Sequence, residues 1–241
     1  MDVHKPIVVL TGAGISQESG IATFRDKQGL WENHSLEDVA TVEAFEKNPK
    51  KVHAFYNERR AQILSGKIEA NAAHLALAKL EARFPGGVHI VTQNVDNLHE
   101  KAGSFNVTHM HGSLLEAKCI ETDRAFPCTQ NLSPQDACPC CGKKGNVRPN
   151  NVWFGEIPYE LDKIFTSIEQ CGLFISIGTS GQVYPAAGFI QHVKLKTASP
   201  AVELNLEPSP LSYMFNEKIY GKASEIVPAF VERLLKDHKL Q

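Results

Sequence analysis

The sequence predicts an α/β fold, a doubly wound parallel sheet with a cysteine-rich metal-binding module inserted in it. Short β-branched apolar segments alternate with helical segments over most of the chain, which favours a parallel sheet covered by helices. Small or polar residues follow several of these segments, as they do where open parallel sheets bind ligands. Five of the six cysteines lie between positions 119 and 141, where the alternation stops.

The length and charge of the chain bound the class of protein. Its 241 residues are enough for one large domain with a small second lobe. The net charge of −2, with dispersed Lys and Arg, disfavours nucleic acid and anionic membrane as partners. No apolar segment has the length of a membrane span or a signal peptide, so we expect a cytoplasmic location and reduced cysteines.

The first predicted strand, Pro6–Thr11, runs directly into a glycine turn at residues 12–15. A strand, a glycine turn and a helix start can present backbone N–H groups to a phosphate. Gln17 stands where the dinucleotide fingerprint has its third glycine, so a plain tight turn explains the pattern as well. The following stretch, residues 21–31, has no clear period and fits either a lid over a ligand or a packed surface loop.

A helix is predicted over residues 49–64, with Asn48 as its N-cap. Arg59 interrupts the apolar stripe of this helix, where an unpaired guanidinium is costly to bury. Snorkelling of Arg59 to the surface would explain its position. Alternatively, Tyr56 and Arg59, one turn apart, point into a pocket that receives an anionic group.

A second helix over residues 71–84 precedes a buried strand, Val88–Thr92. The polar stretch at residues 93–112 follows that strand and contains three histidines. A polar loop with solvated histidines is the simplest interpretation. Because ligands bind at the carboxyl ends of parallel strands, the stretch is also a candidate site.

The cysteine-rich segment has little periodicity. Cys138 and Cys141 have the C-x-x-C spacing that lets two thiolates bind one tetrahedral zinc ion. We predict that Cys119 and Cys128 complete the site, with Cys140 as the alternative to Cys128. Four protein ligands would make this zinc structural, and a knuckle without metal is the competing interpretation.

The α/β pattern resumes with a strand-like apolar segment at residues 152–156. A helix over residues 159–170 and a buried strand, Leu173–Ile177, follow it. A further strand at residues 201–206 precedes a packing helix over residues 224–238. Both strands end in small or hydrogen-bonding groups, as a nucleotide crevice requires.

Together these motifs resemble the sirtuins, NAD-dependent protein lysine deacylases, and most closely the bacterial CobB type. The resemblance rests on GAGIS, SGIATFR, GLW, TQNVDNLH, HMHG, the cysteine knuckle, VWFGE, GTSGQVYPAAGF and VELNLEPS, which span nearly the whole chain. It implies a Rossmann-like NAD-binding domain, residues 1–33, 68–112 and 149–241. A helical insertion, residues 34–67, and a zinc module, residues 113–148, would form the small lobe.

The resemblance also implies a reaction. The acyl-lysine carbonyl oxygen attacks the ribose carbon of NAD as nicotinamide leaves, a base activates a ribose hydroxyl, and water releases lysine and O-acyl-ADP-ribose. His111 would be that base, with Asn94 also in a catalytic role. A histidine pKa near 6.5 suits a base that works near neutral pH.

The implied ligands of NAD, of the acyl-lysine protein and of one structural zinc ion form three groups. The cofactor residues would be Gly12, Ala13, Gly14, Ile15, Phe24, Arg25, Gln93, Asn94, Asp96, Gly178, Thr179, Ser180, Asn205, Glu207 and Ala223. The substrate residues would be Tyr56, Arg59, Val152, Phe154, Gly155, Glu156, Val183 and Tyr184, with the extended peptide bound between two backbone segments. The metal ligands would be Cys119, Cys128, Cys138 and Cys141.

Tyr56 and Arg59 match the Tyr-x-x-Arg of class III sirtuins, which implies removal of succinyl and malonyl groups beside acetyl groups. The chain departs from the family at Ala22, where proline is common, and at Asn150 and Asn151, which precede VWFGE. These asparagines bear on the peptide-binding edge rather than on the chemistry.

Three other functions compete with deacylation. A nicotinamide-dependent dehydrogenase would need the full glycine fingerprint, which Gln17 interrupts. A non-enzymatic zinc-ribbon module would leave the polar strand ends without a role. A protein mono-ADP-ribosyltransferase shares nicotinamide cleavage and differs only in the acceptor.

Overall fold

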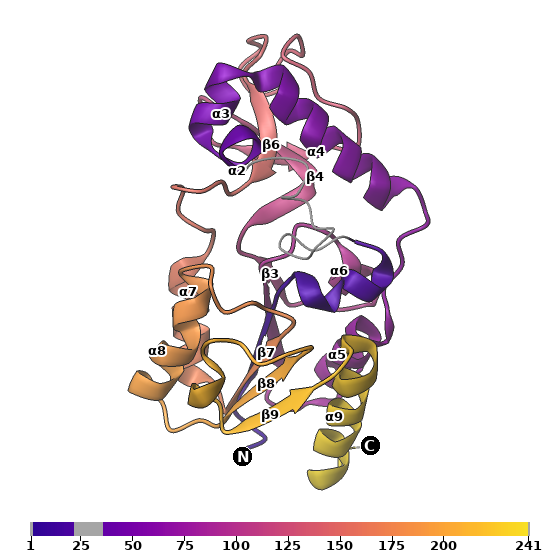
Figure 1. Cartoon of the computed structure of the whole chain (residues 1–241), viewed down its shortest axis with the longest axis vertical. Helices are drawn as coiled ribbons and strands as arrows, with labels where there is room; N and C mark the ends of the chain where they lie inside the picture. The colour runs from indigo at the N-terminus through magenta and orange to yellow at the C-terminus, as the bar shows by residue number, and fades with distance from the viewer. Residues whose placement is uncertain (1, 22–35, 241) are drawn as a thin grey trace.

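The computed structural model describes residues 2–21 and 36–240. Its lower part in Figure 1 is built on a six-stranded sheet with the order β3-β2-β1-β7-β8-β9. The strands are β1 (Ile7–Thr11), β2 (Val88–Thr92), β3 (Val107–His109), β7 (Leu173–Ile177), β8 (Ala201–Asn205) and β9 (Glu217–Tyr220). Every neighbouring pair in this sheet is parallel, which confirms the predicted fold class.

Helices cover both faces of the sheet. They are α5 (Ala72–Arg83) and α9 (Ala223–Asp237) on one face, and α7 (Leu161–Gln170) and α8 (Phe189–Lys196) on the other. From β1 the chain adds β2 and β3 on one side, and it later adds β7, β8 and β9 on the other side. The connections therefore diverge between β1 and β7, and a crevice opens at the carboxyl ends of these strands.

Side-chain caps define the two helices that the sequence predicts before β2. The Asn48 side chain accepts a hydrogen bond from the backbone N–H of Lys51 at 3.0 Å and begins α4 (Pro49–Leu64). The Asn71 side chain accepts one from Ala73 at 2.9 Å and begins α5. Each cap satisfies a backbone donor that a helix start would otherwise leave unpaired.

The upper part of Figure 1 contains α2 (Leu36–Val39), α3 (Val42–Lys47), α4 and a second sheet with the order β5-β4-β6. Its strands are β4 (Gly112–Cys119), β5 (Ala125–Pro127) and β6 (Val147–Asn151), and the pairs are antiparallel. The apolar segment at residues 152–156, expected to be strand-like, lies beyond the end of β6 at Asn151. Within it, Phe154 makes only a single bridge, to Thr41.

Three further expectations concern membrane helices, two cofactor residues and the domain boundaries. Among the described helices, none combines the length and the apolar character needed to cross a membrane. Phe24 and Arg25, in the predicted lid, lie outside the described residues. The domain boundaries given above stay a prediction.

Candidate active site

The ends of β1 and β7 cross at very short range. Gly12 is followed by two short 3-10 turns, Ala13–Ile15 and Gln17–Ser19, in place of the predicted helix start. The backbone N–H of Gly14 donates to the Gly178 carbonyl at 2.9 Å. A Cβ atom at Gly12 would lie 2.8 Å from the Gly178 carbonyl oxygen. Glycine is thus required here for the close approach of two strand ends, and Ile15, 0% exposed, contributes its side chain to the core.

A cavity of about 320 Å³ opens beside this crossing. Four predicted cofactor residues line it: Gly14, Gly178, Asn205 and Ala223. Ala223 is the first residue of α9, so the cavity extends from the strand ends to the start of that helix. Ser180 and Glu207 are exposed and do not line the cavity.

Hydrogen bonds connect the carboxyl ends of β2, β7 and β8, with β1 lying between β2 and β7. The Gln93 side-chain amide, after β2, donates to the Thr179 hydroxyl at 3.1 Å. The Asn205 side-chain amide, at the end of β8, donates to the Thr179 carbonyl at 3.0 Å. Thr179 therefore joins the predicted nicotinamide side of the crevice to its predicted adenosine side.

Ser16, Asn94 and Asp96 form a buried polar cluster next to Gln93. The Asn94 amide donates to the Gly12 carbonyl at 3.2 Å and to the Ser16 hydroxyl at 3.1 Å. The Ser16 hydroxyl donates in turn to the Asp96 carboxylate at 3.0 Å, and the Leu98 N–H donates to the same carboxylate. Burial nevertheless raises the pKa of Asp96 above its ordinary value. The cluster holds Asn94 and Asp96 in single orientations.

His111 has the hydrogen-bond arrangement of a general base. Its Nδ1 lies 3.2 Å from the Gln93 carbonyl oxygen, which can only accept a hydrogen bond, so Nδ1 carries the proton. The neutral ring then has its lone pair on Nε2. Burial lowers the pKa of His111 below its ordinary value, which keeps the ring neutral near pH 7 and leaves the Nε2 lone pair free to accept a proton.

The other two histidines of the stretch have structural partners. His109 donates from Nδ1 to the Asn94 carbonyl and binds the Glu100 carboxylate through Nε2 at 2.8 Å. Although burial alone would lower it, the bond to Glu100 raises the pKa of His109. His99, 1% exposed, binds the Thr11 hydroxyl at 3.0 Å. These contacts give both histidines structural partners, but the expectation of solvated histidines is wrong, since His99 is buried and the His109 side chain is only 20% exposed.

The model of the Sir2 family matches residues 12–185, which contain the glycine crossing, the buried polar cluster and His111. The chain belongs to the Sir2 family. It is 53% identical over 238 residues to the NAD-dependent protein deacylase of Escherichia coli K12, with 98% of this chain and 85% of that protein covered.

Solved Sir2 structures share the whole fold. A Sir2 homologue in complex with NAD has a TM-score of 0.86 and 38% sequence identity, covering 97% of this chain and 90% of the other. A Sir2 variant with a deacetylated p53 peptide and 3'-O-acetyl ADP ribose has a TM-score of 0.80 and 28% identity, covering 98% and 94%.

Among the residues that the Sir2 resemblance assigns to the peptide, Phe154 and Tyr184 are exposed, at 46% and 66%. Glu156 differs from them because its carboxylate already accepts hydrogen bonds from other residues of the chain. The guanidinium of Arg148 donates to both Glu156 oxygens, at 2.6 and 2.8 Å, and the backbone N–H of Trp153 donates at 2.8 Å. Gly155 is exposed, and Val152 and Val183 are half-buried.

Tyr56 and Arg59, the pair that the Sir2 resemblance assigns to the acyl carboxylate, lie on α4 with side chains that are largely buried. Tyr56 is 7% exposed, and its hydroxyl accepts a hydrogen bond from Trp153 Nε1 at 2.9 Å. The Arg59 side chain is 13% exposed and stacks 3.3 Å above the ring of Phe55, donating to the Phe55 carbonyl. Its Nε atom is buried without a hydrogen-bond partner among the described residues.

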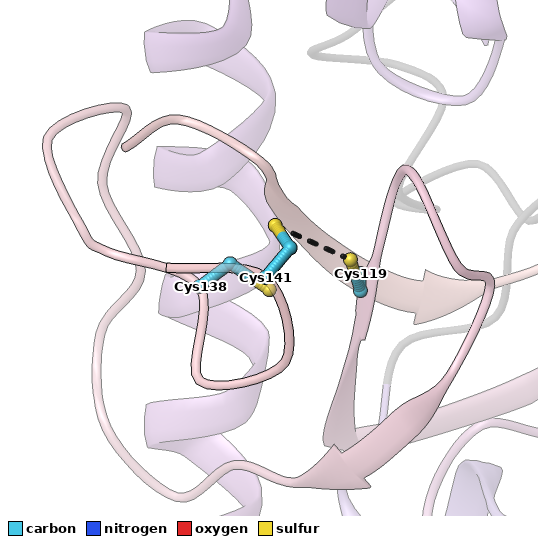
Figure 2. Close-up of side chains that lie close together, drawn as sticks. All are labelled: Cys119, Cys138 and Cys141. Carbon is cyan, nitrogen blue, oxygen red and sulfur yellow. Dashed lines mark hydrogen bonds between the residues drawn. The ribbon is translucent and has the colours of Figure 1, made fainter. Parts of the chain in front are cut away.

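Three of the four predicted zinc ligands of this Sir2 chain lie together, as Figure 2 shows. The sulfur atoms of Cys119, Cys138 and Cys141 lie within 4.8 Å of one another, with 3.8 Å between Cys119 and Cys141. Tetrahedral zinc with bonds of about 2.3 Å separates its sulfur ligands by about 3.8 Å, so the group fits the ion. Cys128 packs in the same cluster but lies outside the group, with its thiol 3.4 Å from the Gln130 carbonyl. Cys140 also packs against the cluster.

Sequence reasoning missed three residues that support this Sir2 site: Ser16, Arg148 and Trp153. Ser16 follows the glycine turn directly, and the available signal was a hydroxyl group at the point where the chain leaves that turn. Arg148 lies in a segment without periodicity and gave no signal. Trp153 lies between two residues assigned to the peptide. Its indole N–H was the available signal, because a buried indole usually needs a hydrogen-bond acceptor.

Proposed function

We propose that the chain catalyses the NAD-dependent removal of acyl groups from protein lysines, with release of nicotinamide and O-acyl-ADP-ribose. The observation that carries this proposal is the tautomer of His111, whose Nδ1 bonds the Gln93 carbonyl and leaves Nε2 as a base. The base lies at the carboxyl end of a parallel sheet whose strand ends carry the cofactor residues. NAD, when bound, supplies the electrophilic ribose carbon and the ribose hydroxyls.

The described residues fit NAD in two respects. The crossing of Gly12 and Gly178 keeps side chains out of the space beside the cavity. The amides of Gln93 and Asn94 are held by hydrogen bonds before any ligand arrives, which lowers the entropy lost on binding. The second candidate, mono-ADP-ribosyl transfer, has no observation in its favour, since the curated relatives reported above are named deacylases.

The acyl groups include succinyl and malonyl in this proposal. A guanidinium and a phenol hydroxyl are matched donors for a carboxylate at the end of an apolar channel. Among the described residues, the buried Nε–H of Arg59 has no partner. Its other contacts, the Phe55 ring and carbonyl and an ion pair with Glu58 at 3.8 Å, lie on its own helix. An incoming carboxylate can therefore take this donor without breaking a contact between distant parts of the chain.

Zinc is the proposed structural ion, held by Cys119, Cys138 and Cys141, with Cys128 as the proposed fourth ligand and Cys140 as the alternative. A closed thiolate site would hold β4 to the knuckle and would take no part in the chemistry. The extended substrate peptide would lie between residues 152–156 and 181–184. We place the enzyme in the cytoplasm because free thiols persist in a reducing compartment.

The proposal is tested with matched acetyl-lysine and succinyl-lysine peptides and NAD. The wild-type enzyme should release nicotinamide and deacylated peptide from both, and His111→Ala should lose both activities. Arg59→Met should lower the ratio of succinyl to acetyl kcat/KM at least about tenfold, since it removes a charge-assisted hydrogen bond. A peptide that gains ADP-ribose would refute deacylation, and an equal loss of both activities in Arg59→Met would refute the acyl specificity.

A further inference from the structure

The indole of Trp153 connects the proposed peptide-binding segment to the proposed acyl pocket. Trp153 is 2% exposed, and its Nε1–H donates to the Tyr56 hydroxyl at 2.9 Å across 97 positions of the chain. An indole nitrogen can only donate a hydrogen bond. The Tyr56 oxygen must therefore accept at this contact, and its own hydrogen has to point elsewhere.

Tyr56 keeps that hydrogen at every physiological pH. Burial raises the pKa of the phenol to about 12, although the bond from Trp153 and the charge of Arg148 act in the opposite direction. Among the described residues, Trp153 is the only hydrogen-bond partner of the Tyr56 hydroxyl. The phenol is thus a neutral donor without an acceptor, one helical turn from Arg59.

Trp153 is itself held on several sides. The Arg148 guanidinium stacks 3.4 Å above the indole, and the Phe45 ring lies 5.3 Å away, centroid to centroid. Arg148 is fixed by its paired bonds to Glu156, which also accepts the backbone N–H of Trp153. Burial alone would raise the pKa of Glu156, but the bonds from Arg148 and Trp153 outweigh it, so the pKa lies below its ordinary value and the carboxylate stays charged. The indole therefore cannot turn away from Tyr56 without breaking this arrangement.

We propose that Trp153 is a positioning residue for acyl selectivity. Its N–H occupies an acceptor lone pair of the Tyr56 hydroxyl and so directs the phenolic hydrogen toward the distal carboxylate of a succinyl or malonyl chain. A neutral acyl chain offers no acceptor at that point, so the bond favours carboxylated chains specifically. The inference rests on the proposed role of Tyr56 and Arg59.

Trp153→Phe is the test because it keeps an aromatic ring for Arg148 and removes the N–H. The ratio of succinyl to acetyl kcat/KM should fall about five- to tenfold, mainly through a higher KM for the succinyl peptide, as expected for one oriented hydrogen bond to a charge. The ratio of succinyl to pentanoyl, a neutral chain of similar length, should fall equally. A packing role would instead change all three substrates in proportion.

A double-mutant cycle separates positioning from packing. Tyr56→Phe should lower the same ratio, and adding Trp153→Phe to it should cause no further fall, since the hydroxyl that Trp153 directs is already gone. Phe45→Leu is the matched control, because it loosens the packing of the indole and leaves the N–H in place. It should change the acetyl and succinyl activities in the same proportion.

The NMR resonance of the Trp153 indole N–H gives a second measurement, which does not require a Trp153 variant to fold. The chain has two tryptophans and therefore two such signals. It should shift in Tyr56→Phe, and binding of a succinyl peptide should move it more than binding of an acetyl peptide. An unmoved resonance, an unchanged ratio in Trp153→Phe, or full additivity in the cycle would overturn the positioning role. If Arg59→Met also leaves the ratio of succinyl to acetyl kcat/KM unchanged, the proposed carboxylate specificity fails together with this inference. If Arg59→Met lowers that ratio and Trp153→Phe does not, only the positioning role of Trp153 is overturned.

Discussion

Arg60→Met should destabilise the protein far more than the same change at its neighbour Arg59. Arg60 is 1% exposed, and its Nε donates to the Leu114 carbonyl at 2.7 Å. Its Nη1 donates to the Asn57 side chain at 2.9 Å and to the Gln130 carbonyl at 3.3 Å. One guanidinium thus joins α4 to β4 and to the cysteine-rich segment.

The magnitude follows from these contacts. Methionine retains helix propensity and much of the buried volume, but it leaves the three acceptors without this donor. Hydrogen bonds from a charged donor contribute about 1.5–3 kcal/mol each, and removal of a guanidinium that is costly to bury offsets part of the loss. Burial does oppose the charge, since it lowers the pKa of Arg60. We expect a net loss of about 3 kcal/mol in the free energy of unfolding.

Chemical and thermal unfolding of the zinc-loaded enzyme measure this loss. For a chain of this length, about 3 kcal/mol corresponds to a fall in Tm of about 6–12 °C. Arg59→Met is the matched control. The described contacts of Arg59, to the Phe55 carbonyl and ring and to Glu58, lie within its own helix, so this variant should cost less than about 1 kcal/mol. Equal destabilisation by the two variants would refute the view that Arg60 joins these segments.

Two further predictions concern the base and the metal. Burial lowers the pKa of His111, and only the neutral ring acts as a base. On the acid side, kcat/KM should therefore fall with a midpoint below about pH 6.5. A midpoint above pH 7 in the measured pH profile would contradict this. Cys138→Ser should lose bound zinc and unfold at a lower temperature, as measured by metal content and thermal melts, while Cys128→Ser should lose more zinc than Cys140→Ser. The reverse order for the last two would assign the fourth ligand to Cys140.

The parallel sheet was predictable because buried central strands appear as continuous apolar runs. Ile7–Thr11, Val88–Thr92 and Leu173–Ile177 are each buried at every position, and the sequence shows this directly. The helices were predictable for another local reason, the capping asparagines. These signals all lie within a few residues of the element they define.

The small antiparallel sheet was not predictable in the same way. β6 has the sequence VRPNN, and all five residues are buried although most of them are polar. Partners outside the strand, which the local pattern does not show, satisfy some of their polar atoms: Glu156 for Arg148 and Glu116, 34 positions away, for Asn150. Arg60 was missed for the same reason, since its carbonyl partners lie 54 and 70 positions away. The local pattern pointed instead to Arg59, which has few partners and is therefore the arginine available to a ligand.

The proposed sites of acyl selectivity and of catalysis are joined by one backbone contact. The N–H of Val152 donates to the carbonyl of His111 at 2.9 Å, and the next residue, Trp153, donates to Tyr56. Gly112 permits this contact, because its φ is +82° and a Cβ there would lie 2.0 Å from the Asn150 carbonyl oxygen. A substituent at Gly112 would therefore displace β6. The proposed peptide-binding segment, residues 152–156, and the indole of Trp153 would move with it. Mutations at this glycine should accordingly alter the selectivity ratio as well as the rate, even though the residue touches neither the acyl group nor the base nitrogen.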